Sequence, residues 1–285
     1  MRKLFILGAV FVFSLAMLMT SCKKDDPKPD NSGNNNNQET PGGDSEVTPN
    51  QEYPETAVVL PQAVMDIDGN TYDAVQIGNQ VWMAENLRTT KYADGTSIPM
   101  GSTYTFYEPY RYVPGPNQSN GENMENVDHY GYLYNWCAVM HGASSSTANP
   151  SGVQGICPDG WHVPSDAEWT ELTNYMKTQP TYMASGNADH LAKALAATWG
   201  WNSSSEMDAP GDNPSTNNAT GFSDLPAGRY SGYYGSFGIN ASYWSATEYS
   251  SDDGAYMRGI GHDYATVAGG YGYKDFGFSV RCVRD

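Results

Sequence analysis

The chain has 285 residues, with 32 acidic side chains against 15 basic ones and a formal net charge of −17 at pH 7. Because phosphates repel so large an acidic excess, the composition argues against nucleic-acid binding and against direct adhesion to anionic lipid. The part of the chain that follows the N-terminal leader is long enough to bury one sizeable hydrophobic core.

The first residues have the composition of an export signal. Two basic residues precede an apolar run from Leu4 to Met19, shorter than the roughly 20 residues that a membrane-spanning helix needs. Leu18-Met19-Thr20-Ser21-Cys22 resembles a bacterial lipobox, whose cysteine is acylated and becomes the mature N-terminus. We therefore expect a lipoprotein signal peptide over residues 1–21 and lipidation of Cys22. The alternative is an ordinary signal peptide with an incidental cysteine.

Residues 22–56 are expected to be a disordered tether behind the lipidated cysteine. They are rich in Asn, Pro, Gly, Asp and Glu, and they have too few apolar side chains to offset the entropy of ordering. A flexible coil of this length spans roughly 30–35 Å r.m.s.. Lys23-Lys24-Asp25-Asp26 resembles the surface-export signal of Bacteroidetes-type lipoproteins, although it also fits a solvated charge cluster in a linker. We expect an outer-membrane location facing the cell exterior, with membrane contact through the lipid alone.

The domain expected over residues 57–285 begins with a turn and a hairpin. The segment Asp66-Ile67-Asp68-Gly69-Asn70 starts like a calcium loop but lacks the distal glutamate of an EF-hand, so we interpret it as a turn. Alternating residues from Thr71 to Ile77, the pair Gly78-Asn79 and the return from Gln80 to Ala84 predict two antiparallel strands joined by a two-residue turn.

The run from Ile156 to Trp169 combines several local signals. Pro158-Asp159-Gly160 predicts a tight turn, and a short apolar strand follows it. Ser165 with Glu168 forms a capping box, which predicts a helix over residues 165–178. His162 sits between two apolar residues, and we interpret it as a hydrogen-bonded structural histidine rather than a metal ligand or a catalytic group.

The rest of the chain predicts an irregular arrangement. Leu191, Leu195 and Trp199 share one helical face, so a second helix is expected over residues 188–199, with Gly200 as its stop. Short strands are expected near residues 243–247, 255–260, 264–267 and 277–284. Two helices, short antiparallel strands and long loops together predict an α+β domain.

Tyrosine is unusually frequent, at 21 residues against 8 Phe and 7 Trp. Tyr among Gly, Ser and Asn is typical of recognition surfaces, because its ring gives rigid contact area at low entropic cost. The alternative is that these tyrosines pack a loop-rich domain poor in Leu and Ile. The candidate ligand-binding residues are Tyr230, Tyr233, Tyr234, Phe237, Tyr249, Asp252, Asp253 and Tyr256; Tyr264, Tyr271 and Tyr273 extend the Tyr-rich region.

Seven motifs in chain order resemble the signature of the Fibrobacter succinogenes major paralogous domain (FISUMP) family. They are Asp66–Tyr72, Ile77–Leu87, Tyr130–Trp136, Ile156–Trp169, Gly221–Gly228, Tyr243–Thr247 and Gly277–Asp285. The resemblance implies a C-type-lectin-like fold related to that of formylglycine-generating enzymes. In such a fold the chain ends lie together at one pole, so the long loops of residues 200–275 would face away from the tether.

Three cysteines remain besides Cys22, and an exported domain is expected to hold a disulfide. The implied fold brings the chain end back to the first helix, which favours a Cys157–Cys282 bond and leaves Cys137 as a buried free thiol. The pairing Cys137–Cys157 stays open.

No catalytic pattern is visible. The histidines (His129, His141, His162, His190 and His262) lack paired metal-ligand spacing, and the chain has no nucleophile-elbow or phosphate-loop motif. We expect a non-catalytic domain without a cofactor; its acidic surface would accept calcium without requiring it. The expected function is adhesion to, or capture of, an extracellular glycan or protein. The alternatives are a structural or assembly subunit of a surface appendage or envelope complex and, least favoured, polysaccharide hydrolysis.

Overall fold

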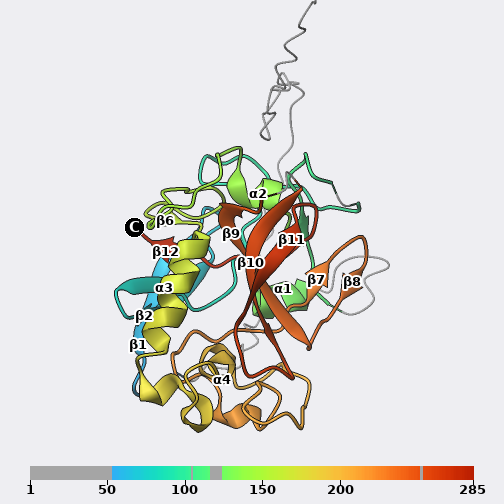
Figure 1. Ribbon diagram of the computed structural model, residues 1–285. Helices are drawn as coiled ribbons and strands as arrows, with labels where there is room; N and C mark the ends of the chain where they lie inside the picture. The colour runs from blue at the N-terminus through green and yellow to red at the C-terminus, as the bar shows by residue number, and fades with distance from the viewer. Residues whose placement is uncertain (1–52, 104, 116–123, 251–252) are drawn as a thin grey trace, which may run out of the picture.

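The computed structural model describes residues 53–103, 105–115, 124–250 and 253–285, and it confirms the mixed α+β class (Figure 1). Within these ranges the strands are β1 (Val58–Met65), β2 (Thr71–Ile77), β3 (Gln80–Met83), β4 (Arg111–Tyr112), β5 (Leu133–Tyr134), β6 (Trp161–His162), β7 (Arg229–Tyr230), β8 (Tyr234–Gly235), β9 (Asn240–Glu248), β10 (Gly254–Gly261), β11 (Ala268–Tyr273) and β12 (Val283–Arg284). The α-helices are α1 (Met124–Tyr130), α2 (Trp136–Met140), α3 (Asp166–Met176) and α4 (Ala192–Leu195).

A five-stranded sheet joins the two ends of the domain. Its strand order is β1-β2-β3-β12-β6, so the C-terminal strand lies between the first hairpin and β6. The predicted hairpin is confirmed, because β2 and β3 pair from Ile77↔Gln80 outward. Gly78 in its turn has φ +63°, and a Cβ there would come within 2.9 Å of the Tyr175 ring. The turn therefore needs glycine for both its backbone conformation and its close contact with α3.

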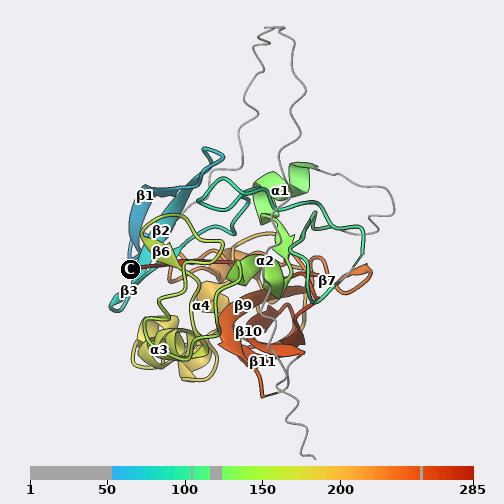
Figure 2. The ribbon, with the colours of Figure 1, turned by 90° about the horizontal axis from the view of Figure 1, so that it is seen from above.

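The second large sheet contains β9, β10 and β11 and lies on the other side of the molecule (Figures 1 and 2). The strands predicted near 243–247 and 255–260 are confirmed as parts of β9 and β10. The strand predicted at 264–267 is misplaced, because the chain turns there and β11 begins only at Ala268. Of the strand predicted at 277–284, only β12 is regular; Phe278 and Ser279 form single bridges to Tyr134 and Tyr243.

Helix α3 confirms the predicted capping box. The Ser165 side chain accepts from the Glu168 backbone N–H at 3.2 Å, and Glu168 Oε2 accepts from the Ser165 N–H at 2.9 Å. Trp169, Leu172 and Met176 form the predicted apolar stripe and are buried in a core with residues of β2, β3 and β9. The helix thus ties the two sheets together.

The second helix is the main error of the sequence prediction. Only Ala192–Leu195 is α-helical, and Ala196 already has extended backbone angles. The carbonyl of Leu195 accepts from the Asp224 N–H at 2.8 Å, and the Ala197 N–H donates to the Asp224 carbonyl at 2.7 Å. A distant segment therefore takes the hydrogen bonds that a continuing helix would need.

A buried polar network connects four of the sequence motifs. Arg281 is only 1% exposed; its Nε donates to Asn86 Oδ1 at 2.9 Å, and its guanidinium also donates to the carbonyls of Phe222 and Ser223. The Tyr243 hydroxyl lies within hydrogen-bond distance of both Asp224 Oδ1 and Asn86 Oδ1. Buried charges and polar groups are tolerated when they are paired in this way. The motifs therefore specify the scaffold of the domain.

Within the described ranges, no helix has the length and apolar composition that crossing a bilayer requires.

Candidate functional site

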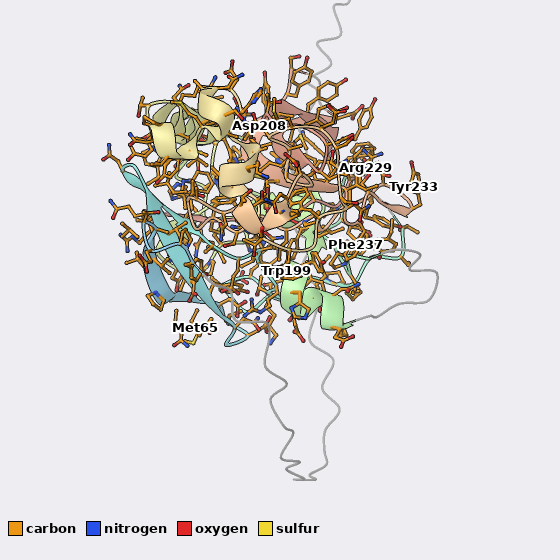
Figure 3. All side chains as sticks on the ribbon, turned by 90° about the horizontal axis from the view of Figure 1, so that it is seen from below. Met65, Trp199, Asp208, Arg229, Tyr233 and Phe237 are labelled. Carbon is orange, nitrogen blue, oxygen red and sulfur yellow. A yellow bond between two sulfur atoms is a disulfide. The ribbon has the colours of Figure 1, made fainter. Side chains whose placement is uncertain are left out.

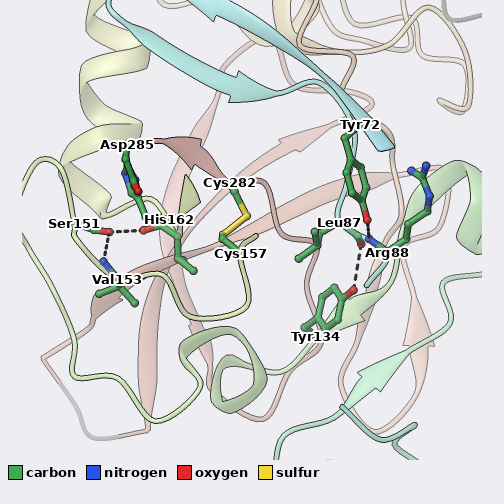
Figure 4. Close-up of a disulfide and its surroundings, with 11 residues drawn as sticks. Tyr72, Leu87, Arg88, Tyr134, Ser151, Val153, Cys157, His162, Cys282 and Asp285 are labelled. Carbon is green, nitrogen blue, oxygen red and sulfur yellow. Dashed lines mark hydrogen bonds and ion pairs between the residues drawn. A yellow bond between two sulfur atoms is a disulfide. The ribbon is translucent and has the colours of Figure 1, made fainter. Parts of the chain in front are cut away.

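The block Ile156–Trp169 is tied to the chain end by a disulfide (Figure 4), by the pairing of β6 with β12 and by an ion pair. Cys157 and Cys282 are bonded, as predicted, with their Cα atoms 6.0 Å apart. His162 is buried, and its two ring nitrogens lie 2.7 Å from Glu168 Oε1 and 2.7 Å from Asp285 Oδ1. Burial opposes the imidazolium, but the two carboxylates outweigh it and raise the pKa of His162. The prediction of a hydrogen-bonded structural histidine is confirmed.

Cys137 corrects one expectation. It is buried in α2, as predicted, but it takes part in a disulfide and is not a free thiol. Cys22, the residue predicted to be lipidated, lies outside the described residues.

The first group of candidate ligand-binding residues lies at the β7–β8 hairpin. Tyr230 is only 5% exposed and stacks on Tyr112 at 4.0 Å between ring centroids, so its ring cannot face a ligand. Phe237 is partly buried against Tyr130 at 4.7 Å, and Tyr234 packs on Tyr230. Tyr233 alone is strongly exposed, at 66%, and Figure 3 shows it at the edge of the molecule. Tyr230 thus belongs to the core, and Tyr234 and Phe237 are partly buried against it.

The second group lies on the outer face of β10 and β11. Tyr249 stacks on Tyr271 at 4.3 Å with an interplanar angle of 8°, and Tyr256 meets Tyr249 edge to face at 5.2 Å. Tyr271 continues to Tyr273 at 6.4 Å. Tyr271 and Tyr273 are 52% and 50% exposed. We call these four residues the sheet tyrosines.

The pairing of the strands places the sheet tyrosines together. Tyr256 lies directly opposite Tyr271, so both side chains stand on the same face. Gly272 points to the other face, where a Cβ would come within 2.5 Å of Phe278 and 3.1 Å of Trp244. The inner side of β11 therefore lies flat on the core, and the rings on either side of Gly272 project outward.

The acidic candidates do not form a metal centre in the described part of the chain. Asp252 lies outside the described residues, and Asp253 is exposed and accepts the Lys274 N–H through its backbone carbonyl. The Asp66 segment is the predicted turn, and its carboxylate accepts hydrogen bonds from the backbone or side chains of Asp68, Asn70 and Tyr72. No group of three or more His, Cys, Asp or Glu among the described residues comes together to hold a metal ion.

Sequence reasoning did not single out Tyr271 and Tyr273, the most exposed members of the cluster. The signal that would have indicated them is the alternation Tyr271-Gly272-Tyr273, which has the two-residue period of a strand with one bare face. This alternation falls outside the strand that the sequence predicts, which is placed at residues 264–267 instead of Ala268–Tyr273.

Comparison with known proteins places the chain in a family. The model of the Fibrobacter succinogenes major domain matches residues 75–284. No curated protein and no solved structure matches the chain. The matched range contains the disulfide and the buried polar network. It also contains both large sheets, apart from β1 and the first residues of β2. The chain therefore belongs to the Fibrobacter succinogenes major domain family.

Proposed function

We propose that the chain is a lipid-anchored surface protein whose domain recognises an extracellular glycan or protein through the sheet tyrosines, without catalysis. The observation that carries the proposal is the gathering of Tyr249, Tyr256, Tyr271 and Tyr273 on one face, with the last two half-exposed. A ring already held by its neighbours loses little conformational entropy when a ligand binds. Such rings give contact area to a protein and stacking faces to a sugar ring.

A C-type-lectin-like architecture is part of the proposal. Two features support it: the first hairpin and the C-terminal strand share one sheet, and a disulfide fixes the chain end beside the β6–α3 block. In that arrangement the tether would leave from the pole of the five-stranded sheet. The three-stranded sheet lies on the other side of the molecule (Figure 2). Its tyrosines would therefore face away from the tether.

Alanine at both Tyr271 and Tyr273 is expected to abolish binding while leaving the fold intact, because both rings are half-exposed and contribute little to the core. The measurement is a glycan array and an extracellular-protein array probed with the full chain, with and without calcium. The matched control is Tyr264→Ala, which removes a 64% exposed tyrosine outside the cluster. Equal binding by the double variant and the control would refute this placement of the site.

The free edge of β11 favours a second candidate, an assembly subunit. The Gly254 carbonyl accepts from the Tyr249 N–H on the β9 side, and backbone groups alternate in direction along a strand. Ala255 therefore faces its partner Gly272, and the backbone N–H and C=O of Tyr271 point away from β10. In the described part of the chain no backbone group pairs with them. Such an edge accepts an added strand from another chain.

Proline and alanine at Tyr271 separate the two candidates. Both changes remove the ring, but only Tyr271→Pro also removes the outward N–H. An edge strand tolerates a proline whose missing N–H would point away from the sheet, so the domain should still fold. If the chain assembles through this edge, crosslinked complexes recovered from membranes should survive in Tyr271→Ala and disappear in Tyr271→Pro. Loss of ligand binding in both variants alike would favour recognition by the ring.

A further inference from the structure

A cavity of about 190 Å³ opens beside the disulfide, far in sequence from the sheet tyrosines. Its walls come from the end of β1, the Thr89–Ala93 segment and the loop that carries Cys157. The block Ile156–Trp169, which sequence reasoning assigned to scaffold alone, thus supplies one wall of a cavity through Ile156, Pro158 and Asp159.

The apolar part of this cavity continues onto the surface. Ile156 and Pro158 are buried, whereas Met65 and Ile67 stand at its rim with 64% and 48% of their surface exposed. Neighbouring exposed side chains of this size beside a concave site are a recurrent mark of a binding surface. The rim therefore offers apolar contact to an occupant that extends beyond the cavity.

The polar part of the cavity is acidic once its internal pairs are counted. Lys91 is neutralised by Asp68, with 3.0 Å between Nζ and Oδ1. Asp66 is buried, and each of its two oxygens accepts two hydrogen bonds, so its carboxylate has no capacity for a ligand. Asp159 is exposed, and its Oδ1 accepts from Gln154 Nε2 at 2.8 Å. Its other carboxylate oxygen retains its capacity to accept.

We propose that this cavity binds a lysine or arginine side chain of a partner polypeptide. The methylene stem would lie along Ile67, Ile156 and Pro158, and the cationic head would reach Asp159. Long basic side chains bury their stems on apolar surface while the head group stays at a carboxylate or in water. The negative charge of Asp66 and Asp159 excludes an anionic occupant, and the net charge of −17 for the chain attracts a basic partner.

The exposed rim favours a side chain on a polypeptide over a free amine. Met65 and Ile67 extend outside the cavity, where they would contact the backbone that flanks the inserted side chain. A free amine would leave both uncovered. The site is independent of the sheet tyrosines, so either proposal can fail without the other.

The experiment is methyl NMR on the full chain with labelled Ile and Met, titrated with capped tripeptides. The peptides are acetyl-Gly-X-Gly-amide with X as lysine, norleucine or glutamate, together with free n-butylamine. The lysine peptide should shift the signals of Met65, Ile67 and Ile156 and bind about tenfold more tightly than the norleucine peptide at low salt. Salt of about 0.5 M should reduce this preference, because it screens exposed charges. Butylamine should bind more weakly than the lysine peptide.

The variant Asp159→Asn should remove the preference for lysine over norleucine, and its matched control Asp128→Asn, at an exposed position of α1, should not. Tyr271→Ala with Tyr273→Ala should leave the titration unchanged. Equal shifts with lysine, norleucine and glutamate peptides, no shift with any of them, or an equal effect of the two aspartate variants would overturn the proposal. Butylamine binding as tightly as the peptide would overturn its polypeptide part.

Discussion

Two buried titratable groups make the scaffold sensitive to pH. The carboxyl of Asp224 is fully buried, and this burial raises its pKa to about 7 even though Arg281 opposes the shift. The folded state therefore prefers the protonated acid, while in the unfolded chain the same carboxyl ionises with its ordinary pKa of 3.8. His162 is held between two carboxylates that raise its pKa above 6.5, so the folded state also prefers the imidazolium. Both groups bind protons more tightly in the folded protein.

The free energy of unfolding is therefore expected to fall as pH rises. The contribution of Asp224 decreases between about pH 4 and pH 7, and that of His162 is complete below its unfolded pKa and is lost as pH rises through its raised folded pKa. Urea unfolding of the domain from about pH 5 to pH 8 measures the slope. Asp224→Asn should flatten it, because asparagine does not titrate, whereas Asp128→Asn on the surface should leave it unchanged. A wild-type stability that rises over this range would contradict both assignments.

At the scale of elements, strand β11 shows how one residue sets which face of a strand packs on the core. Gly272 has no side chain, and the strand therefore approaches Phe278 and Trp244 closely enough that a Cβ would be within 2.5 Å of the Phe278 ring. Gly270, two residues earlier on the same face, has only Met257 Sδ near it, at 3.8 Å. The two glycines differ in packing although their sequence neighbourhoods are similar.

The substitution Gly272→Ala should destabilise the domain by about 1–3 kcal/mol, because the added methyl overpacks the core under β11. Gly270→Ala is the matched control and should be nearly neutral, since its methyl meets an ordinary van der Waals contact. Chemical denaturation measures both. If the two variants lose the same stability, the flat packing of β11 is not what holds Tyr271 and Tyr273 outward.

At the scale of the whole molecule, the structure closes the chain on itself. Strand β12 pairs with β3 and β6, and the disulfide joins Cys157 to Cys282. The Asp285 carboxylate is hydrogen-bonded to His162 Nδ1. The C-terminal end is therefore fixed to the same sheet that begins at Val58. A tether at the N-terminal side would thus anchor one pole of the domain, which is the geometry that the proposed surface role requires.

The anchor itself is tested by mass spectrometry of the protein extracted from membranes. An acylated N-terminal cysteine adds lipid mass to the first mature peptide, and the expected mature chain begins at Cys22. The lipid occupies the Cys22 sulfur in a thioether, so lipidation and a disulfide to Cys137 exclude each other, and the same mass spectrum distinguishes them. Cys22→Ser should leave the protein without lipid and release it from the membrane fraction. Surface protease should remove the domain from intact cells. A mature protein without lipid mass would contradict the lipoprotein assignment.

The sequence by itself determined the structures that short-range interactions hold. The Gly78 turn, the Ser165–Glu168 capping box and the Asp66 turn are each stabilised by groups a few residues apart, and all three were predicted. The α+β class followed from the same local signals. The resemblance to the family added the Cys157–Cys282 bond, which no local spacing specifies.

Tertiary structure alone decided which aromatic residues are exposed and where the second helix ends. Tyr230 is buried because Tyr112 stacks on it, and Tyr271 is exposed because Gly272 lies on Phe278. Helix α4 stops because the backbone of Asp224 takes its hydrogen bonds. In each case the deciding contact comes from another element, and similar Tyr-rich, Gly-rich segments give no local sign of it. Of the candidate residues, these contacts bury Tyr230, whereas Tyr249 and Tyr256 lie beside Tyr271 and Tyr273 on the face that the proposed function uses.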